Sequence, residues 1–185
     1  MKKFELTSEF ITMFGKKLFR IKALISFGNV EAGELGGYIE KEENLSHNGN
    51  AWVYGNAWVY GNARVYDDAR VYGNARVYGN ARVYGNARVY GNAWVYGNAW
   101  VYGNALLKFR SDILWISNIG SRNDTTTFFK TKENKINITC GCFRGTIEQF
   151  EKAVEETHGG SLFEKQYKIS IELAKTSILR SEQDD

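Results

Sequence analysis

The chain has 185 residues, enough for one or two small domains, and its formal net charge of +3 is far below the clustered basic surface of a dedicated nucleic-acid-binding protein. It contains no apolar run of about 18 residues and no apolar signal core near its start, so we expect a soluble cytoplasmic protein without a membrane partner. Its two cysteines are two positions apart and cannot define a disulfide framework.

Residues 1–34 predict a strand and a turn ahead of a repetitive region. Apolar and polar residues alternate for a while between Lys17 and Ile25, which is typical of a strand. Gly28 and Gly33 then bracket a turn, because glycine adopts backbone angles that other residues avoid. We therefore assign residues 1–34 to an N-terminal strand and cap segment.

Residues 51–104 repeat one hexapeptide, Ala-(Arg or Trp)-Val-Tyr-Gly-Asn, nine times, with Asp67 and Asp68 in place of Gly-Asn once. A short fixed period is typical of a solenoid. The alternation predicts a four-residue strand with Ala and Val on the inner face and with Arg or Trp and Tyr on the outer face. Gly-Asn breaks each strand, because both residues tolerate left-handed backbone angles. Stacking of successive coils would bury the inner face, which a single unit cannot do.

Counted from valine, the unit resembles the hexapeptide repeat of left-handed parallel β-helices, with an aliphatic residue first and a small residue fifth. The resemblance implies a left-handed β-helix of triangular coils, three units to a coil, which we place at residues 35–110. It also implies a homotrimer, which would cover the aromatic outer side chains. We expect these side chains to form ladders across the coils: Trp52, Arg70 and Arg88; Trp58, Arg76 and Trp94; Arg64, Arg82 and Trp100; and tyrosine ladders that include Tyr72, Tyr78 and Tyr84.

The same period predicts where the β-helix starts. Leu35 lies 18 residues before Val53, so we expect a degenerate first coil to begin near Leu35. A polar, irregular terminal coil is normal for a solenoid. In this register the alanine positions fall on Ile39 and Leu45, and the valine positions fall on Lys41 and His47.

Residues 111–185 lack the repeat and predict a small α+β module. Short strands are expected at residues 113–116, 125–131 and 136–143, the last two forming a hairpin. Two capping boxes, Thr146 to Gln149 and Ser161 to Glu164, predict the starts of two helices, and we expect residues 181–185 to fray. The predicted shared faces are Ile136, Ile138, Cys140 and Cys142 in the hairpin, Ile147, Phe150 and Val154 in the first helix, and Tyr167, Ile171, Ala174 and Ile178 in the second.

The loop at residues 120–124 is the first candidate for a ligand site. Arg122 offers a bidentate fork for a phosphate or carboxylate, and nearby hydroxyl and backbone N–H groups would complete an anion cradle. None of these residues is a convincing nucleophile or base, so we expect binding without turnover. An ordinary polar loop is the alternative interpretation. The residues of the predicted cradle are Ser121, Arg122, Asn123, Thr125, Thr126 and Thr127.

The cysteines and the second histidine have plain structural interpretations. Cys140 and Cys142 would be half of a zinc site, but such a site needs four ligands and only His158 is left to help. We therefore expect the cysteines to pack in the core, and we expect no metal. His158, next to Gly159, is expected at a helix C-terminus, where the helix dipole favours a cation.

The segment Gly-Glu-Leu-Gly-Gly-Tyr-Ile-Glu at residues 33–40, with Asn-Leu-Ser at 44–46 and the repeats after it, resembles phage and prophage proteins described as hexapeptide-repeat or transferase-like. The match covers residues 17–104, and tail motifs such as Gly-Cys-Phe-Arg-Gly-Thr resemble a module found in some of these proteins. The resemblance brings no catalytic residues. It implies a binding or scaffold protein in the bacterial host cytoplasm, which antagonises a host process by sequestering a nucleotide-like ligand or by holding a host protein.

Near-identical repeats give an even surface, whereas a catalytic site needs particular residues at particular places. We therefore favour a non-enzymatic function without a cofactor. The alternative is a hexapeptide-class acyltransferase that uses acyl-coenzyme A and a histidine base, for which His47 and His158 are the histidines present. A minor alternative is stacking of single-stranded nucleic acid on the aromatic ladders.

Overall fold

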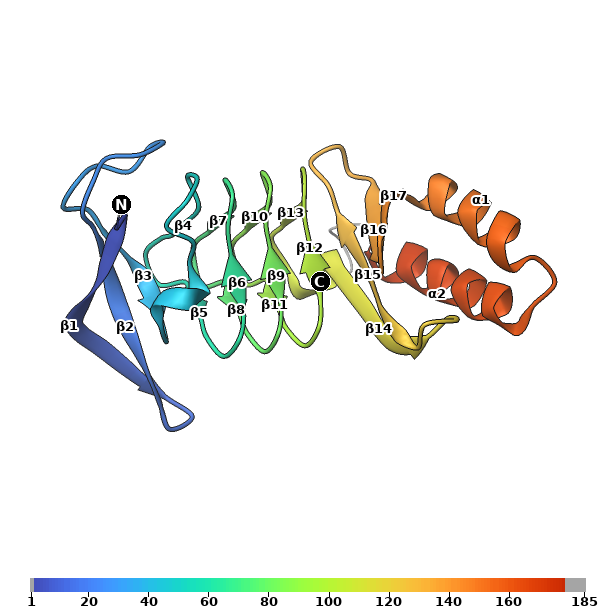
Figure 1. Ribbon diagram of the computed structural model, residues 1–185, viewed down its shortest axis with the longest axis horizontal. Coiled ribbons are helices and arrows are strands. Elements are labelled where there is room, and N and C mark those ends of the chain that lie inside the picture. Colours follow the sequence, from blue (N-terminus) through green and yellow to red (C-terminus); the bar gives the residue numbers. More distant parts are fainter. Residues whose placement is uncertain (1, 179–185) are drawn as a thin grey trace.

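The computed structural model describes residues 2–178, and the expected fraying of residues 181–185 lies outside this range. Figure 1 shows four parts in succession along the long axis: an N-terminal β-hairpin, a β-solenoid, an antiparallel sheet and two helices. The predicted fold class is confirmed, since a β-solenoid of about four turns is followed by a sheet and two C-terminal helices.

Short parallel strands form the three sides of the solenoid. Strands one coil apart pair in register at a spacing of 18 residues, as Trp58 does with Arg76. The first side contains β4, β7, β10 and β13, the second contains β3, β5, β8 and β11, and the third contains β6, β9 and β12. The strands after the first coil are β4 (Trp52–Val53), β5 (Trp58–Val59), β6 (Arg64–Val65), β7 (Arg70–Val71), β8 (Arg76–Val77), β9 (Arg82–Val83), β10 (Arg88–Val89), β11 (Trp94–Val95), β12 (Trp100–Val101) and β13 (Leu106–Leu107).

These strands are two residues long rather than the four predicted, because the corner takes more of each unit than Gly-Asn. The Ala57 N–H donates to the Tyr54 carbonyl at 3.1 Å, so tyrosine and the following alanine close a turn around the glycine and asparagine. Gly79 shows the left-handed backbone that the corner requires, with φ +70°. Asp67 occupies the equivalent position in another corner and adopts the same conformation, with φ +58°.

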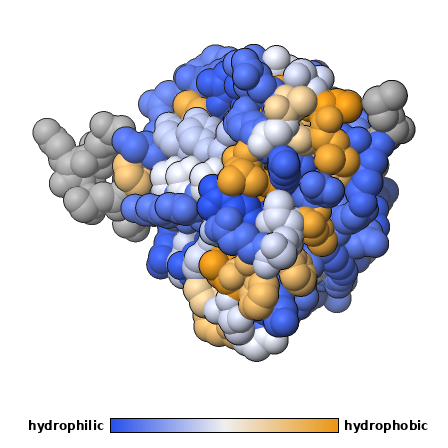
Figure 2. All heavy atoms as spheres, turned by 90° about the vertical axis from the view of Figure 1, so that its left-hand side faces the viewer, coloured by the Kyte–Doolittle hydropathy of each residue, from blue (hydrophilic) through white to orange (hydrophobic). Residues whose placement is uncertain are grey.

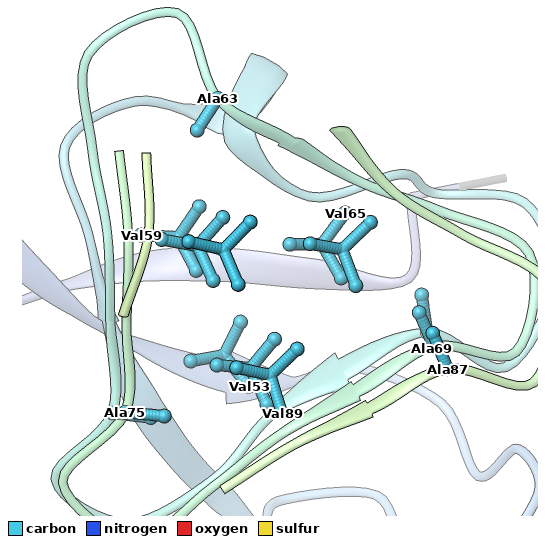
Figure 3. Packing of buried hydrophobic residues seen from close by; sticks show 14 of the residues in the cluster. Val53, Val59, Ala63, Val65, Ala69, Ala75, Ala87 and Val89 are labelled. Carbon is cyan, nitrogen blue, oxygen red and sulfur yellow. The ribbon is translucent and has the colours of Figure 1, made fainter. Parts of the chain in front are cut away.

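The interior of the solenoid is filled by the valines and alanines of the repeats, as predicted. Every valine from Val53 to Val101 and every alanine from Ala51 to Ala105 is fully buried. Figure 3 shows the valines projecting inward from the three sides and the alanines lying near the corners. Leu107 continues the valine row at the C-terminal end, opposite Val89. The inner face of the coils is therefore a single apolar core.

The first coil has a register different from the predicted one. Ile39 pairs with Val59, and Leu45 pairs with Val65, so both lie 20 residues from their partners and occupy valine positions. The predicted register would have placed Lys41 inside, and burying its charge without a partner is costly. Two additional residues between Leu45 and Val53 relieve this conflict.

A β-hairpin closes the N-terminal end. Strands β1 (Phe4–Met13) and β2 (Lys16–Ala23) are antiparallel, and β2 continues onto β3 (Leu35–Ile39) of the second side. The strand predicted near Lys17 is confirmed, whereas β1 was not predicted. Figure 2, which looks onto this end, shows apolar atoms interspersed among hydrophilic ones.

Trp52 was predicted as a surface ladder residue, and this is wrong. It is fully buried beneath the N-terminal segment, with its ring 6.2 Å from that of Phe4 and 5.4 Å from that of Phe27. Its indole N–H has no hydrogen-bond partner among residues 2–178. The terminal coil needs a cover for its open core, and this tryptophan belongs to that cover.

An antiparallel sheet closes the other end, in the order β14 (Ile113–Ile119), β15 (Asp124–Lys130), β16 (Ile136–Cys140) and β17 (Phe143–Thr146). It is joined to the last coil by hydrogen bonds: the Trp100 N–H donates to the Thr127 hydroxyl, and the Thr139 hydroxyl donates to the Trp100 carbonyl, both at 3.2 Å. Two predictions for this region are wrong. Residues 136–143 are not one strand, because Gly141 turns the chain, and Cys142 is exposed in that turn.

Helices α1 (Ile147–His158) and α2 (Leu162–Ile178) pack on the sheet. The first capping box is confirmed, since the Thr146 hydroxyl accepts from the Gln149 N–H and the Gln149 side chain accepts from the Thr146 N–H. The second is half confirmed: the Ser161 hydroxyl accepts from the Glu164 N–H as predicted, but the Glu164 side chain accepts from the N–H of Gly160 instead of that of Ser161. The predicted apolar stripes of both helices are buried. Neither of these helices is long and apolar enough to cross a membrane.

Candidate functional site

Each side of the solenoid carries an outward row of side chains that contains arginine, and the rows of the second and third sides also contain tryptophan. Strand pairing aligns the residues of the three expected ladders at the 18-residue spacing that the resemblance implied, except that Trp52 of the first ladder is buried. None of the repeat arginines forms an ion pair with another residue in the described part of the chain. The ladders therefore differ mainly in what covers each guanidinium group.

The tyrosine ladders are occupied largely by contacts within themselves. Tyr60, Tyr78 and Tyr96 stack with ring-centre distances of 4.9 and 4.8 Å and almost parallel planes. Tyr66 stacks on Tyr84, and Tyr72 on Tyr90, in the same way. Burial in these stacks raises the pKa of Tyr78. The rings thus expose mainly their edges, and Tyr96, at the end of its stack, is the exception at 38 % exposed.

The second side carries an alternating stack of indole and guanidinium groups. Arg76 lies between two tryptophans, 4.3 Å from the ring centre of Trp58 and 4.9 Å from that of Trp94. Arg110 covers the other face of Trp94 at 3.4 Å. Each such contact contributes about 0.5–1 kcal/mol at an exposed site. The stack therefore holds two planar cations in fixed orientations.

The position of Arg110 depends on a short helical turn after the last coil. Asp112 is buried, and its carboxylate accepts from the backbone N–H groups of Lys108 and Phe109 at 2.6 and 2.8 Å. Lys130 lies 3.8 Å from the same carboxylate. These contacts fold residues 108–112 back over the end of the second side, which places the Arg110 guanidinium on Trp94.

A cavity of about 560 Å³ opens beside this stack. Arg76 and Arg110 supply two positive charges to it, and no acidic residue lines it. The remaining polar lining offers amide and hydroxyl donors, which suits an oxyanion. The other lining residues are Asn74, Asn92, Trp94, Phe109 and Ser111.

A second cavity, of about 370 Å³, adjoins the first and shares Trp94 and Arg110 with it. Its walls are mainly apolar and aromatic. The ring centres of Tyr96 and Trp115 lie 4.3 Å apart and nearly perpendicular, so they form an aromatic corner. Ile113 and Leu114 complete the lining. A cationic and an aromatic compartment thus lie on either side of one residue pair.

Another cavity, of about 590 Å³, lies on the third side and has a mixed charge. Arg64 and Arg82 line it, but so do Glu42 and Glu43. His47 is also at this cavity, where its Nδ1 accepts from the Lys3 N–H at 3.2 Å. Its Nε2 faces the Glu42 carboxylate at 3.5 Å. Since both ring nitrogens have partners, a general base here would first have to break a contact of the N-terminal cap.

The structure separates the residues of the predicted anion cradle. Ser121, Arg122 and Asn123 are exposed in the turn between β14 and β15, where the Arg122 side chain lies against Gly141. The three threonines are buried in β15, and their hydroxyl groups already have partners. Thr125 bonds to Ser117, Thr126 to the Cys140 sulfur and Thr127 to Trp100.

One part of that region does meet a ladder. Asp124 and Thr125 line a small cavity of about 220 Å³ together with Arg82 and Trp100. Because Asp124 is acidic, this cavity is less suited to an anion than the one beside Arg76. The residues that complete it are Asn80, Asn98, Thr139 and Gly141.

The cysteines and His158 occupy structural positions. The Cys140 sulfur lies 3.6 Å from the Tyr167 hydroxyl, and burial, followed by this contact, raises the pKa of Tyr167. His158 is the last residue of α1, as predicted, with its ring 5.8 Å from those of Phe163 and Tyr167. Within residues 2–178, no three His, Cys, Asp or Glu side chains gather in an arrangement that would hold a metal ion.

Sequence reasoning missed Arg110 and Trp115, which lie after the repeats and outside the 18-residue register. The available signal was the presence of a cationic and an aromatic residue, Arg110 and Trp115, soon after the last coil. The turn that places them on the second side depends on Asp112, which the repeat does not predict.

Comparison with known proteins supports the solenoid itself. Residues 57–71, 69–85 and 81–97 match the family model described as the YdcK beta solenoid repeat. The chain is thus a β-solenoid repeat protein with repeats similar to those of YdcK. No curated protein matches it.

Proposed function

We propose that the protein is a non-enzymatic binding protein that takes an anionic ligand on the second side of its solenoid. The observation that carries this proposal is the Trp58–Arg76–Trp94–Arg110 stack, which presents two guanidinium groups without ion-pair partners among the described residues to an acid-free cavity. Stacking on indole rings, two for Arg76 and one for Arg110, restricts the arginine side chains before a ligand arrives. Less conformational entropy is then lost on binding.

The repeated architecture supports binding rather than turnover. Arginine is always charged and donates from a rigid fork, which makes it a good oxyanion ligand and a poor proton acceptor. The cavity beside Arg76 is lined by one hydroxyl group, that of Ser111, and by no carboxylate or imidazole that could act as its base. By contrast, the acyltransferase alternative relies on His47, whose two nitrogens face other groups of the protein.

The biological setting rests on the phage and prophage resemblance. In that setting the anionic ligand, or an acidic patch on a host protein, would be held by the second side and withdrawn from a host process. We propose sequestration of a small ligand, because the cavity lies within the range of about 300–1,000 Å³ that is typical of small-molecule sites. An acidic host protein is the competing outcome of the same test.

Titration calorimetry with inorganic phosphate and with pyrophosphate tests the proposal. We expect binding to the wild type and at least a tenfold loss in Arg76→Gln and in Arg110→Gln. Arg64→Gln is the matched control, since it removes an exposed repeat arginine from a different side. At 100 times its dissociation constant, a ligand should also stabilise the fold by about 2.7 kcal/mol in thermal unfolding. Equal affinities for all variants would contradict the proposal.

A further inference from the structure

We infer that the ligand of the second side is a nucleoside monophosphate, with its phosphate on Arg76 and Arg110 and its base in the aromatic cavity formed by Tyr96 and Trp115. This inference rests on the proposed anion binding and adds a second compartment to it. The two cavities, of about 560 and 370 Å³, share Trp94 and Arg110, so one ligand can enter both.

The chemical difference between the two compartments carries the inference. The first cavity presents guanidinium, amide and hydroxyl donors, whereas the second presents Tyr96, Trp115 and two aliphatic residues. An inorganic anion would use only the first. A ligand with a phosphate at one end and a flat ring at the other matches both, because aromatic side chains stack on any base.

The state of the aromatic residues also favours an occupant. Tyr96 is the most exposed tyrosine of the repeats, and no further tyrosine stacks on its outer face. Trp115 meets it edge-on rather than face to face, with an interplanar angle of 81°. The two rings therefore line a corner and do not close it, which leaves ring surface for a planar group.

Arg110 is the residue that would connect the two ends of the ligand. Its guanidinium is stacked on Trp94 and lines both cavities. A phosphate held in its plane would lie at the boundary between the compartments. From there the ribose could cross to the aromatic side without leaving the protein surface. Neither cavity contains an acidic residue that would repel the phosphate.

Calorimetry with adenosine monophosphate, inorganic phosphate and adenosine tests the inference, because these probes separate the anion from the ring. We expect the monophosphate to bind about tenfold more tightly than phosphate, because a stacked base contributes roughly fivefold to a hundredfold in affinity. Trp115→Leu should remove most of this advantage and leave the affinity for phosphate unchanged. Leucine keeps an apolar contact to the last coil, and Tyr96→Leu serves as a second variant if Trp115→Leu does not fold.

The possible results distinguish this inference from the proposed function. Equal affinity for phosphate and adenosine monophosphate, both reduced by Arg76→Gln, would overturn the nucleotide and retain anion binding. Binding of adenosine as tight as that of its monophosphate would overturn the role of the arginines. Absence of binding by every probe would overturn both proposals.

Discussion

Arg110 lies 3.4 Å from the ring centre of Trp94, the shortest cation–aromatic contact among residues 2–178. Trp94 is one of the nine repeat positions, whereas Arg110 follows the last coil and belongs to a short turn. The contact therefore joins the regular surface of the solenoid to the non-repetitive module. Arg110 adds a second guanidinium group at one end of an otherwise regular ladder, so this end differs from the rest of the surface in shape and charge.

The first prediction concerns the residue that positions Arg110. Asp112→Asn should weaken phosphate binding several-fold and destabilise the fold by about 1–2 kcal/mol, because its carboxylate accepts two backbone hydrogen bonds at the turn. Calorimetry and urea unfolding measure the two effects. Glu156→Gln is the control, since this carboxylate is exposed on α1. Unchanged phosphate affinity in Asp112→Asn would show that the turn is not needed to place Arg110.

The second prediction concerns the core. Val77 is fully buried, whereas the neighbouring position of the repeat points outward, as Arg64 does. Val77→Asp should cost several kcal/mol, because a carboxylate would be buried without a partner. Arg64→Asp should change the free energy of unfolding by less than about 1 kcal/mol. Similar urea midpoints for the two variants would contradict the inward and outward assignment.

The repeat made most of the solenoid predictable. Its period of six indicated the inner valines and the outward positions, since each unit sees the same neighbours, and the resemblance to hexapeptide β-helices supplied the 18-residue coil that aligns them in ladders. The predicted register and exposure were wrong at the N-terminal end, where the coil has the terminal segment as its neighbour instead of another repeat. Ile39 and Leu45 take valine positions because the first coil is two residues longer, and Trp52 is buried because a terminal coil must be covered.

The candidate site was harder to predict, because it depends on contacts between distant segments. Arg122 and the threonines after it are close in sequence, but the threonines are buried because β15 is covered on both faces, whereas Arg122 lies in the exposed turn before it. Conversely, Arg76 and Arg110 are far apart in sequence, and Trp94 brings them together. Capping boxes and apolar stripes predicted the helices because those signals are local.

The third prediction concerns pH. Burial raises the pKa of Glu40, but hydrogen bonds from Lys16 and from the Gly61 N–H outweigh it and hold this pKa below its ordinary value of 4.5. A carboxyl group with a depressed pKa stabilises the fold above its unfolded pKa, and this stabilisation is lost as the pH falls through the folded value.

The melting temperature of Glu40→Gln should therefore be lower than that of the wild type at pH 7, and the two should converge as the pH falls below the ordinary value of 4.5. Glu43→Gln is the matched control, because Glu43 is exposed and lies three residues further along the chain. A difference that stays constant from pH 7 to pH 3 would show that the charge of Glu40 is not what stabilises the corner.

The fourth prediction concerns assembly. A homotrimer is implied by the resemblance to hexapeptide β-helices, and closed symmetric oligomers are the usual way to cover apolar faces. Stacking already covers the faces of the tyrosine rings, and the proposed ligand site occupies the second side, so we expect the trimer contacts on the first and third sides of the solenoid. Light scattering should return about three times the monomer mass of 21.1 kDa. A monomer at micromolar concentration would contradict the trimer.

The fifth prediction concerns Lys3, which closes the N-terminal end of the core. Its ammonium group donates to the Gly49 and Ala51 carbonyls at 3.2 and 2.9 Å and lies 4.7 Å from the ring centre of Phe27. Burial lowers the pKa of Lys3 from 10.5 to about 8, although Asp68 acts in the opposite direction. Between these two values the unfolded chain binds more protons than the folded protein, so this group makes the fold more stable as the pH rises from 8 towards 10.

Lys3→Met removes this titration, and Lys2→Met is the matched control because Lys2 is exposed and pairs with Glu42. The tyrosines are common to all three proteins, so their ionisation cancels in the comparison. We expect the melting temperature of the wild type, relative to Lys3→Met, to increase between pH 7.5 and 9.5, and the difference from Lys2→Met to stay flat. A flat difference for Lys3→Met as well would mean that the ammonium group is solvated in solution, and the N-terminal segment would then not be closed over the first coil as Trp52 and Phe4 indicate.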